Sequence, residues 1–204
     1  MKKLFLVSSF KHAANMMTEF GLDLKGKTVT FIPTASNVEK VVFYVNAGKK
    51  ALQELGLIID ELNISTASYD EIKRKLRSND IIYVTGGNTF FLLQELQRTG
   101  ADTLIIDEVN AGKLYIGESA GAMVLSENIE YVKKMDNETA APDLTSSDAL
   151  GLVDFFPVPH YNSFPFKKIT QSILDTYAST HNLIPICNTE ALVINNKERK
   201  RKSL

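Results

Sequence analysis

The sequence predicts an α/β fold, doubly wound, in which helices cover both faces of a mostly parallel sheet. Short apolar runs bounded by turn residues alternate with segments of helical periodicity, which is typical of βαβ units. The runs are continuous rather than alternating, which indicates strands buried on both faces. Two of them end in glycine-containing turns, as a strand that runs directly into a helix requires.

The predicted elements follow one another along most of the chain. Strands are expected at residues 4–8, 28–33, 57–62, 80–85, 113–117, 183–187 and 191–194. Helical spacing covers 38–55, 90–96, 103–110 and 166–178. A capping box, Ser68-Tyr69-Asp70-Glu71, is expected to open a further helix that ends near Arg77. Residues 127–150 fit neither pattern.

Length and composition favour one domain spanning residues 1–204. The hydrophobic content of 44% and the charged content of 23% are those of a globular protein. A net charge of -1 does not provide the excess of basic charge that binding to nucleic acid or to an acidic membrane requires. No apolar stretch reaches the length of a membrane span, and the apolar N-terminal run is too short for a signal peptide. A cytoplasmic protein without nucleic-acid or membrane partners is expected.

Two other features are interpreted as structural. The basic run 197–202 is predicted to be a solvated tail. Cys187 is the only cysteine, so it forms no internal disulfide, and its apolar neighbours indicate a buried core thiol. Because no group of His, Cys, Asp and Glu has metal-ligand spacing, neither a metal nor a cofactor is expected.

The candidate nucleophile is Ser119, in the segment Gly117-Glu118-Ser119-Ala120-Gly121-Ala122 after the apolar run 114–116. On a tight turn from strand to helix, a serine oxygen projects from the sheet edge toward the helix N-terminus. The flanking glycines remove the β-carbons that would collide at such an elbow. The pattern also occurs by chance in plain turns.

A second loop, Thr85-Gly86-Gly87-Asn88-Thr89, follows a neighbouring predicted strand. Ligands of parallel sheets bind at the carboxyl ends of the strands, where such loops converge. The N–H groups of Gly87 and Ala120 are the predicted oxyanion donors, and Asn88 is a candidate for contacting substrate. The alternative is an ordinary turn in which Asn88 or Thr89 caps the helix. A phosphate-binding loop is disfavoured because its lysine and spacing are missing.

His160 is the candidate general base. It follows Pro157-Val158-Pro159, which fixes its backbone while its ring can face a cleft. His12 and His181 are not obviously delivered to the sheet edge. The acid of a Ser-His-acid charge relay is not resolved: Asp136 is the first choice and Asp143 the second, with Glu118 and Asp148 behind them, and each could instead be a solvated charge.

Three blocks together resemble peptidase family S51, the family of aspartyl dipeptidases. They are Gly86-Gly87-Asn88-Thr89-Phe90, Gly117-Glu118-Ser119-Ala120-Gly121-Ala122 and Pro159-His160-Tyr161. The resemblance covers nearly the whole chain and implies a class I glutamine-amidotransferase-like (flavodoxin-like) fold. It also implies a serine peptidase that hydrolyses small peptides next to an N-terminal acidic residue through an acyl-enzyme. Ser119 would be the nucleophile, His160 the base, Gly87 an oxyanion donor and Asp136 the orienting acid.

The chain departs from this family at two places. Lys167 and Lys168 stand where aspartyl dipeptidases carry an arginine for the substrate carboxylate, and lysine lacks the planar fork of arginine. Glu118 replaces a bulky aromatic residue. Strict aspartyl specificity is therefore not expected. Two alternative functions also remain: a cyanophycinase-like amide hydrolase, and a non-catalytic small-molecule binding protein. The expected assembly is a monomer or a homodimer.

Overall fold

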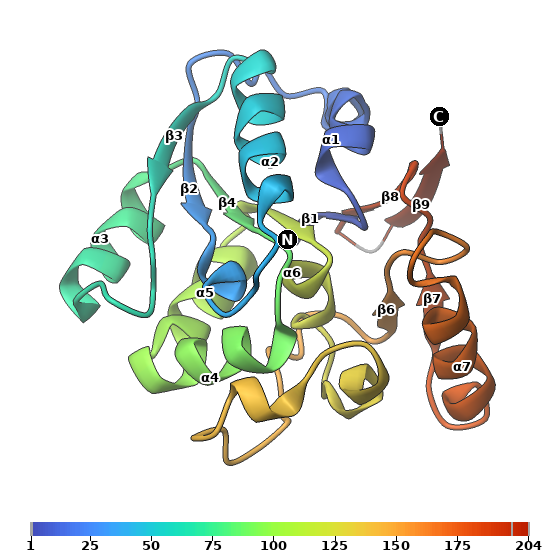
Figure 1. Ribbon diagram of the computed structural model, residues 1–204. Helices are drawn as coiled ribbons and strands as arrows, with labels where there is room; N and C mark the ends of the chain where they lie inside the picture. Colours follow the sequence, from blue (N-terminus) through green and yellow to red (C-terminus); the bar gives the residue numbers. More distant parts are fainter. Residues whose placement is uncertain (1, 197, 204) are drawn as a thin grey trace.

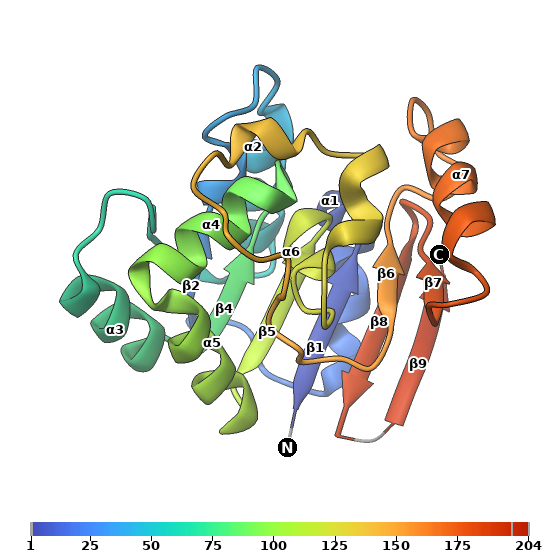
Figure 2. The ribbon, with the colours of Figure 1, turned by 90° about the horizontal axis from the view of Figure 1, so that it is seen from below.

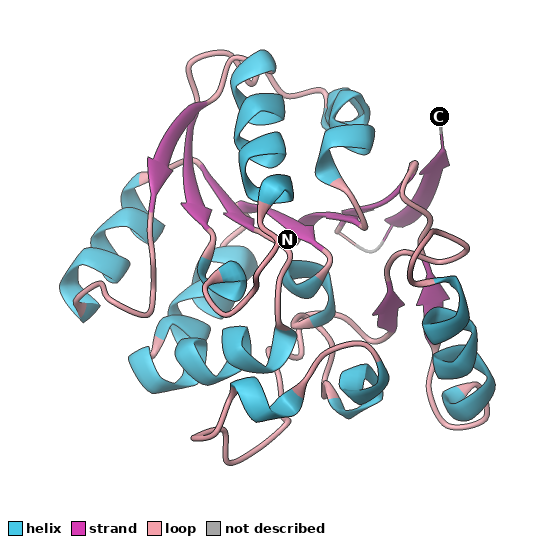
Figure 3. Cartoon of the chain, in the orientation of Figure 1, coloured by secondary structure: helices cyan, strands magenta, loops and turns pink. Residues whose placement is uncertain are grey.

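The computed structural model describes residues 2–196 and 198–203. Within this part of the chain, seven strands form one sheet in the order β3-β2-β4-β5-β1-β8-β9. Their bounds are β1 Lys3–Val7, β2 Thr28–Ile32, β3 Ile58–Glu61, β4 Ile81–Val84, β5 Leu114–Glu118, β8 Glu190–Asn195 and β9 Glu198–Ser203. The first five run parallel, whereas β8 and β9 are antiparallel to their neighbours. The predicted doubly wound, mostly parallel sheet is confirmed (Figure 3).

Helices cover both faces of this sheet (Figures 1 and 2). One face carries α1 Phe10–Ala13 and α2 Phe43–Glu54; the other carries α3 Tyr69–Ser78, α4 Thr89–Thr99, α5 Ala101–Asn110 and α6 Ala120–Met123. Short 3-10 turns lie at Ala14–Phe20, Thr34–Ser36, Glu130–Lys134 and Glu138–Ala140. Each sheet face has its own buried core, because alternate residues of β1, such as Phe5 and Leu6, enter opposite clusters. No helix in residues 2–196 and 198–203 is long and apolar enough to cross a membrane.

A second, two-stranded sheet stands beside this layer. It pairs β6 Phe156–Val158 in parallel with β7 Leu183–Pro185, next to helix α7 Lys167–Tyr177. The Tyr161 amide donates to the Ile186 carbonyl, so the pairing continues beyond β6. The loops that follow β6 and β7 therefore leave the small sheet at the same end.

The predicted start of the helix after Ser68 is confirmed. The Ser68 hydroxyl accepts a hydrogen bond from the Glu71 amide at 3.3 Å, as the first half of a capping box requires. Other predictions were wrong. Residues 38–42 precede α2 instead of belonging to it, and β3 is an edge strand in which Ile58 is 56% exposed. The periodicity of 38–55 did not reveal this difference, because apolar residues of the 38–42 segment lie on the surface.

The basic C-terminal run and the cysteine also differ from expectation. Residues 198–203 form strand β9 along β8 rather than a solvated tail; Lys197 lies outside the described residues. The run forms backbone hydrogen bonds with β8, which its charged side chains do not prevent. Charged side chains at the exposed edge of a sheet also hinder pairing with another chain. Cys187 is only half-buried. Burial and the nearby Glu190 carboxylate raise the pKa of its thiol, which disfavours the thiolate.

Helix α6 approaches strands β4 and β5 closely through Gly117 and Gly121. A β-carbon at Gly121 would stand 2.3 Å from the Val84 carbonyl oxygen, and one at Gly117 would stand 2.5 Å from the Gly121 carbonyl oxygen. Both atoms belong to backbone, which cannot rotate away. The expected collision of β-carbons at the elbow is therefore confirmed.

We predict that Gly121→Ala lowers the free energy of unfolding by about 2 kcal/mol or more, because the new methyl group overpacks a backbone contact. Urea denaturation of both proteins measures the difference. Gly151→Ala is the matched control, since its β-carbon meets nothing within 4 Å and only a positive φ of 57° opposes it; we expect a loss of about 1 kcal/mol there. Equal stability of Gly121→Ala and the unmodified protein would contradict the prediction.

Candidate active site

Ser119 occupies a strained turn between β5 and α6. Its backbone has φ 49° and ψ -107°, a conformation that residues with side chains rarely adopt. The turn is held on both sides: the Ser119 amide donates to the Val7 carbonyl at 2.9 Å, and its carbonyl accepts from the Ala122 and Met123 amides. The strand ends and the helix begins at this single residue, which leaves the hydroxyl at the carboxyl edge of the sheet.

The hydroxyl of Ser119 meets the imidazole of His160. Ser119 Oγ and His160 Nε2 are 2.9 Å apart, although 41 positions of sequence separate them. His160 follows the end of β6 with φ 62°. The ring of Phe166 stacks on the imidazole with centroids 4.7 Å apart. The structure thus brings together the two residues that the sequence analysis paired.

A buried serine, Ser8, fixes the histidine backbone. Its hydroxyl accepts a hydrogen bond from the His160 amide at 2.9 Å and donates one to the Ile186 carbonyl at 2.7 Å. Ser8 directly follows β1. This strand pairs with β5, and Ser119 directly follows β5. One hydroxyl therefore ties the small sheet, and with it His160, to the main sheet.

Asn188, in the loop after β7, is the partner of the imidazole. His160 Nδ1 and Asn188 Oδ1 are 2.9 Å apart, so the Nδ1–H donates to the amide oxygen. This bond leaves the Nε2 lone pair facing the Ser119 hydroxyl, which is the tautomer that a base needs. Burial lowers the pKa of His160, and the bond to Asn188 offsets part of that effect. The imidazole is consequently neutral and able to accept a proton at neutral pH.

Asp136, the first choice for the orienting acid, lies elsewhere. Its Oδ2 accepts hydrogen bonds from the Thr89 amide at 2.8 Å and the Thr89 hydroxyl at 2.6 Å, so it holds the start of α4. Burial raises the pKa of its carboxyl to about 6. The expected contact with His160 is wrong, because the chain between elbow and histidine folds over α4, whereas the loop after β7 runs beside the histidine.

None of the other three candidate acids forms the expected hydrogen bond to the imidazole, whose Nδ1 is bonded to Asn188. The exposed Asp143 is placed by its backbone amide, which donates to the Gln94 side-chain oxygen at 2.8 Å. The Asp148 carboxylate accepts from the Asn128 side-chain amide at 3.2 Å. Glu118 is buried on the face of the main sheet that is opposite to α6. Its carboxylate accepts from the Tyr83 hydroxyl at 2.5 Å and the Phe10 amide at 2.9 Å. Burial raises the pKa of Glu118 to about 6.

The loop after β4 lies directly against the elbow. A β-carbon at Gly86 would stand 3.2 Å from the Ser119 β-carbon, and one at Gly87 would collide with the Ala35 backbone at 2.2 Å. Gly87 has φ 137°, which favours glycine. Ala120 is the first residue of α6, so its N–H has no acceptor within that helix. Both predicted oxyanion donors therefore belong to the backbone around the Ser119 hydroxyl.

Asn88 caps helix α4, and both polar atoms of its side chain are bonded within the protein. Its side-chain oxygen accepts from the Phe91 amide at 2.9 Å, and its side-chain nitrogen donates to the Asn137 carbonyl. The structure therefore corresponds to the capping alternative for this residue. His12 and His181 are likewise occupied outside the site, by Ser9 and Thr180 respectively.

Sequence reasoning missed Asn188 and Ser8. Both lie just beyond the end of a strand, which is the position where polar side chains reach a ligand site in parallel sheets. The signal was present in the sequence, but a search for an acid passes over an asparagine. The hydrogen bond of Ser8 to Ile186 depends on how the two sheets meet, which the sequence pattern does not show.

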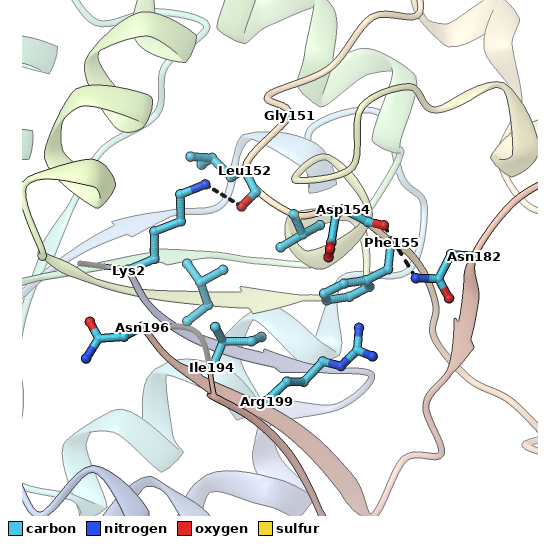
Figure 4. A pocket seen from close by; sticks show the side chains of 11 residues that line it. Lys2, Gly151, Leu152, Asp154, Phe155, Asn182, Ile194, Asn196 and Arg199 are labelled. Atoms are coloured by element: carbon cyan, nitrogen blue, oxygen red, sulfur yellow. Dashed lines mark hydrogen bonds between the residues drawn. The ribbon is translucent and has the colours of Figure 1, made fainter.

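A hollow of about 760 Å³ lies at the opposite edge of the main sheet, where β1 begins and β8 ends. Figure 4 shows Lys2 crossing it to donate a hydrogen bond to the Leu152 carbonyl, with Phe155 and Arg199 on its far side. Neither Ser119 nor His160 lines this hollow. The serine and histidine thus form a separate site at the carboxyl edge.

Comparisons with known proteins agree with this arrangement. Residues 4–202 match peptidase family S51. The chain is 61% identical over 204 residues to an uncharacterized peptidase of Listeria monocytogenes, with 100% of both proteins covered. It is 33% identical over 143 residues to peptidase E of Haemophilus influenzae, covering 66% of this chain and 64% of that protein. A solved structure described as a candidate peptidase E of Listeria monocytogenes has a TM-score of 0.96 and 60% identity, covering 100% of this chain and 99% of that one.

The family match and the two Listeria matches extend over the strands and loops that carry the elbow and the histidine. A protein with this sequence and this fold is a peptidase, and the chain belongs to peptidase family S51, whose members are of the serine type.

Proposed function

We propose that this peptidase hydrolyses short peptides through an acyl-enzyme on Ser119, with His160 as general base and acid. The observation that carries the proposal is the 2.9 Å contact between Ser119 Oγ and His160 Nε2, with Nε2 free to accept the proton. Asn188 takes the orienting position that a carboxylate fills in other hydrolytic triads. It holds the tautomer without adding a charge.

The reaction follows from these positions. Ser119 Oγ attacks the scissile carbonyl carbon while its proton passes to His160 Nε2. The Gly87 and Ala120 amides donate to the oxygen that gains negative charge. His160 then gives the proton to the leaving amine, the C–N bond breaks, and an ester to Ser119 remains. Water, deprotonated by His160, hydrolyses that ester and restores the serine.

Removing the hydroxyl tests the nucleophile. We predict that Ser119→Ala lowers kcat/KM by a factor on the order of 10³ or more, because the acyl-enzyme cannot form, with little change in the free energy of unfolding. Hydrolysis of a dipeptide library that includes α-linked and β-linked aspartyl peptides measures the loss. Ser179→Ala, in an exposed turn, is the control. Undiminished hydrolysis by Ser119→Ala would exclude this mechanism.

Changing Asn188 tests the histidine. We predict that Asn188→Asp raises the pKa of His160, since a carboxylate beside Nδ1 stabilises the imidazolium. The neutral ring is the active form, so kcat/KM falls at low pH as the ring becomes protonated. This acid limb of the pH profile should move to higher pH by about 1–3 pH units. Asn188→Ala should move the limb to lower pH and reduce kcat, because the bond that favours the cation and fixes the tautomer is lost.

The pH profiles and the His160 NMR titration of all three proteins provide the measurement. If the acid limb keeps its position in both variants, the limb does not report His160, and the assignment of the base is wrong.

A further inference from the structure

Thr85, the residue directly after β4, carries a buried hydroxyl that the mechanism does not use. The side chain is fully buried, and its hydroxyl donates to the Gly86 carbonyl at 2.9 Å. The hydroxyl of Thr30, which is equally buried, instead donates to the carbonyl of Lys75 in another element, at the same distance. The Thr85 bond joins two consecutive residues, so it ties no separate elements together. It fixes the conformation of the loop.

The Gly86 carbonyl and the Gly87 amide belong to one peptide group. This group is planar and trans, so its C=O and its N–H point in opposite directions. Because the carbonyl is held by the buried Thr85 side chain, the Gly87 amide points away from that side chain. Thr85 and Gly86 are buried, whereas Gly87 is only half-buried. The amide therefore belongs to the part of the loop that solvent reaches.

The peptide group on the other side of Gly87 is fixed as well. The Asn88 amide donates to the Ala35 carbonyl at 2.8 Å. The Gly87 amide itself donates to no acceptor within residues 2–196 and 198–203, which leaves it to a water molecule or to a substrate oxygen. Ser119 adjoins the same loop, since a β-carbon at Gly86 would stand 3.2 Å from the Ser119 β-carbon.

We propose that Thr85 is a positioning residue for the oxyanion site. Its hydroxyl fixes the peptide group between Gly86 and Gly87 and thereby directs the Gly87 amide to the oxygen that becomes negatively charged. The inference rests on the proposed function, in which this amide stabilises that charge. A donor that is already oriented needs no reorganisation when the charge forms, so Thr85 contributes to the rate of the reaction and not to the binding of the peptide.

Thr85→Val keeps the branched shape of the side chain and removes the hydroxyl. We expect kcat for the best-cleaved dipeptide of the library to fall about 10- to 100-fold with KM nearly unchanged, because a misdirected donor loses part of what one oxyanion donor contributes. Thr85→Ser keeps the hydroxyl and should recover most of this loss. If Thr85→Ser is impaired as much as Thr85→Val, the hydroxyl is not responsible and the inference is wrong.

Thr30→Val is the matched control. The Thr30 hydroxyl donates to the Lys75 carbonyl and also accepts from the Asn79 side chain. Its removal should therefore lower the free energy of unfolding at least as much as Thr85→Val does. We expect kcat per folded molecule to stay unchanged in Thr30→Val. A fall in kcat as large as that of Thr85→Val would show that both losses reflect weakened packing, which would overturn the inference.

The rate of reaction with a fluorophosphonate probe gives an independent readout. Ser119 Oγ attacks the phosphorus atom while its proton passes to His160, the phosphoryl oxygen gains negative charge in the oxyanion site, and fluoride leaves. We expect the second-order rate constant of labelling to fall in Thr85→Val by about the same factor as kcat/KM and to stay unchanged in Thr30→Val. Labelling of Thr85→Val at the rate of the unmodified protein would overturn the inference.

Failure of the proposed function gives a different result. If the unmodified protein neither cleaves a peptide nor reacts with the probe, or if Ser119→Ala keeps both activities, the proposed function is wrong and the assignment of Thr85 fails with it. If the unmodified protein has both activities, Ser119→Ala has neither, and Thr85→Val behaves like the unmodified protein, only the assignment of Thr85 is wrong.

Discussion

The close approach of α6 to β4 and β5 is the constraint on which the site depends. Val84 and Gly121 touch through their backbones, and any side chain at Gly121 would separate them. That contact forces the chain to turn from strand to helix within Ser119, which explains the strained backbone of this residue. It also places the start of α6 and the Gly86-Gly87 loop side by side. Nucleophile and oxyanion donors are thus consequences of one packing arrangement.

A single buried hydroxyl, that of Ser8, holds the part of the site that contains His160 and Asn188. Ser8 joins the end of β1 to the histidine backbone and to the strand that leads to Asn188. The two sheets therefore keep a constant relative position at their carboxyl ends. The imidazole stacks on Phe166 and is bonded at both nitrogens, so three contacts fix its orientation.

The sequence was sufficient for the fold and for the two reacting side chains. Continuous apolar runs identify the parallel strands, and glycines at fixed spacing identify the elbow, since both patterns record local backbone requirements. The third residue of the site was not predictable in the same way. A Ser-His-acid triad led us to expect an acid between residues 119 and 160. Asp136 instead accepts a hydrogen bond from the Thr89 amide at the start of α4. Asn188 reaches the imidazole because β6 and β7 are parallel neighbours, a pairing that local patterns do not reveal.

The basic strand β9 has a consequence for the molecule in solution. It forms one end of the main sheet, and its outer backbone groups offer hydrogen bonds to any extended segment that comes near. The residues Arg199, Lys200, Arg201 and Lys202 bring four cations to this border. Glu198 and Glu190 pair with Lys200 and Arg201, but cations still outnumber carboxylates along this border. An excess of one charge at a sheet edge disfavours the addition of a second copy strand to strand.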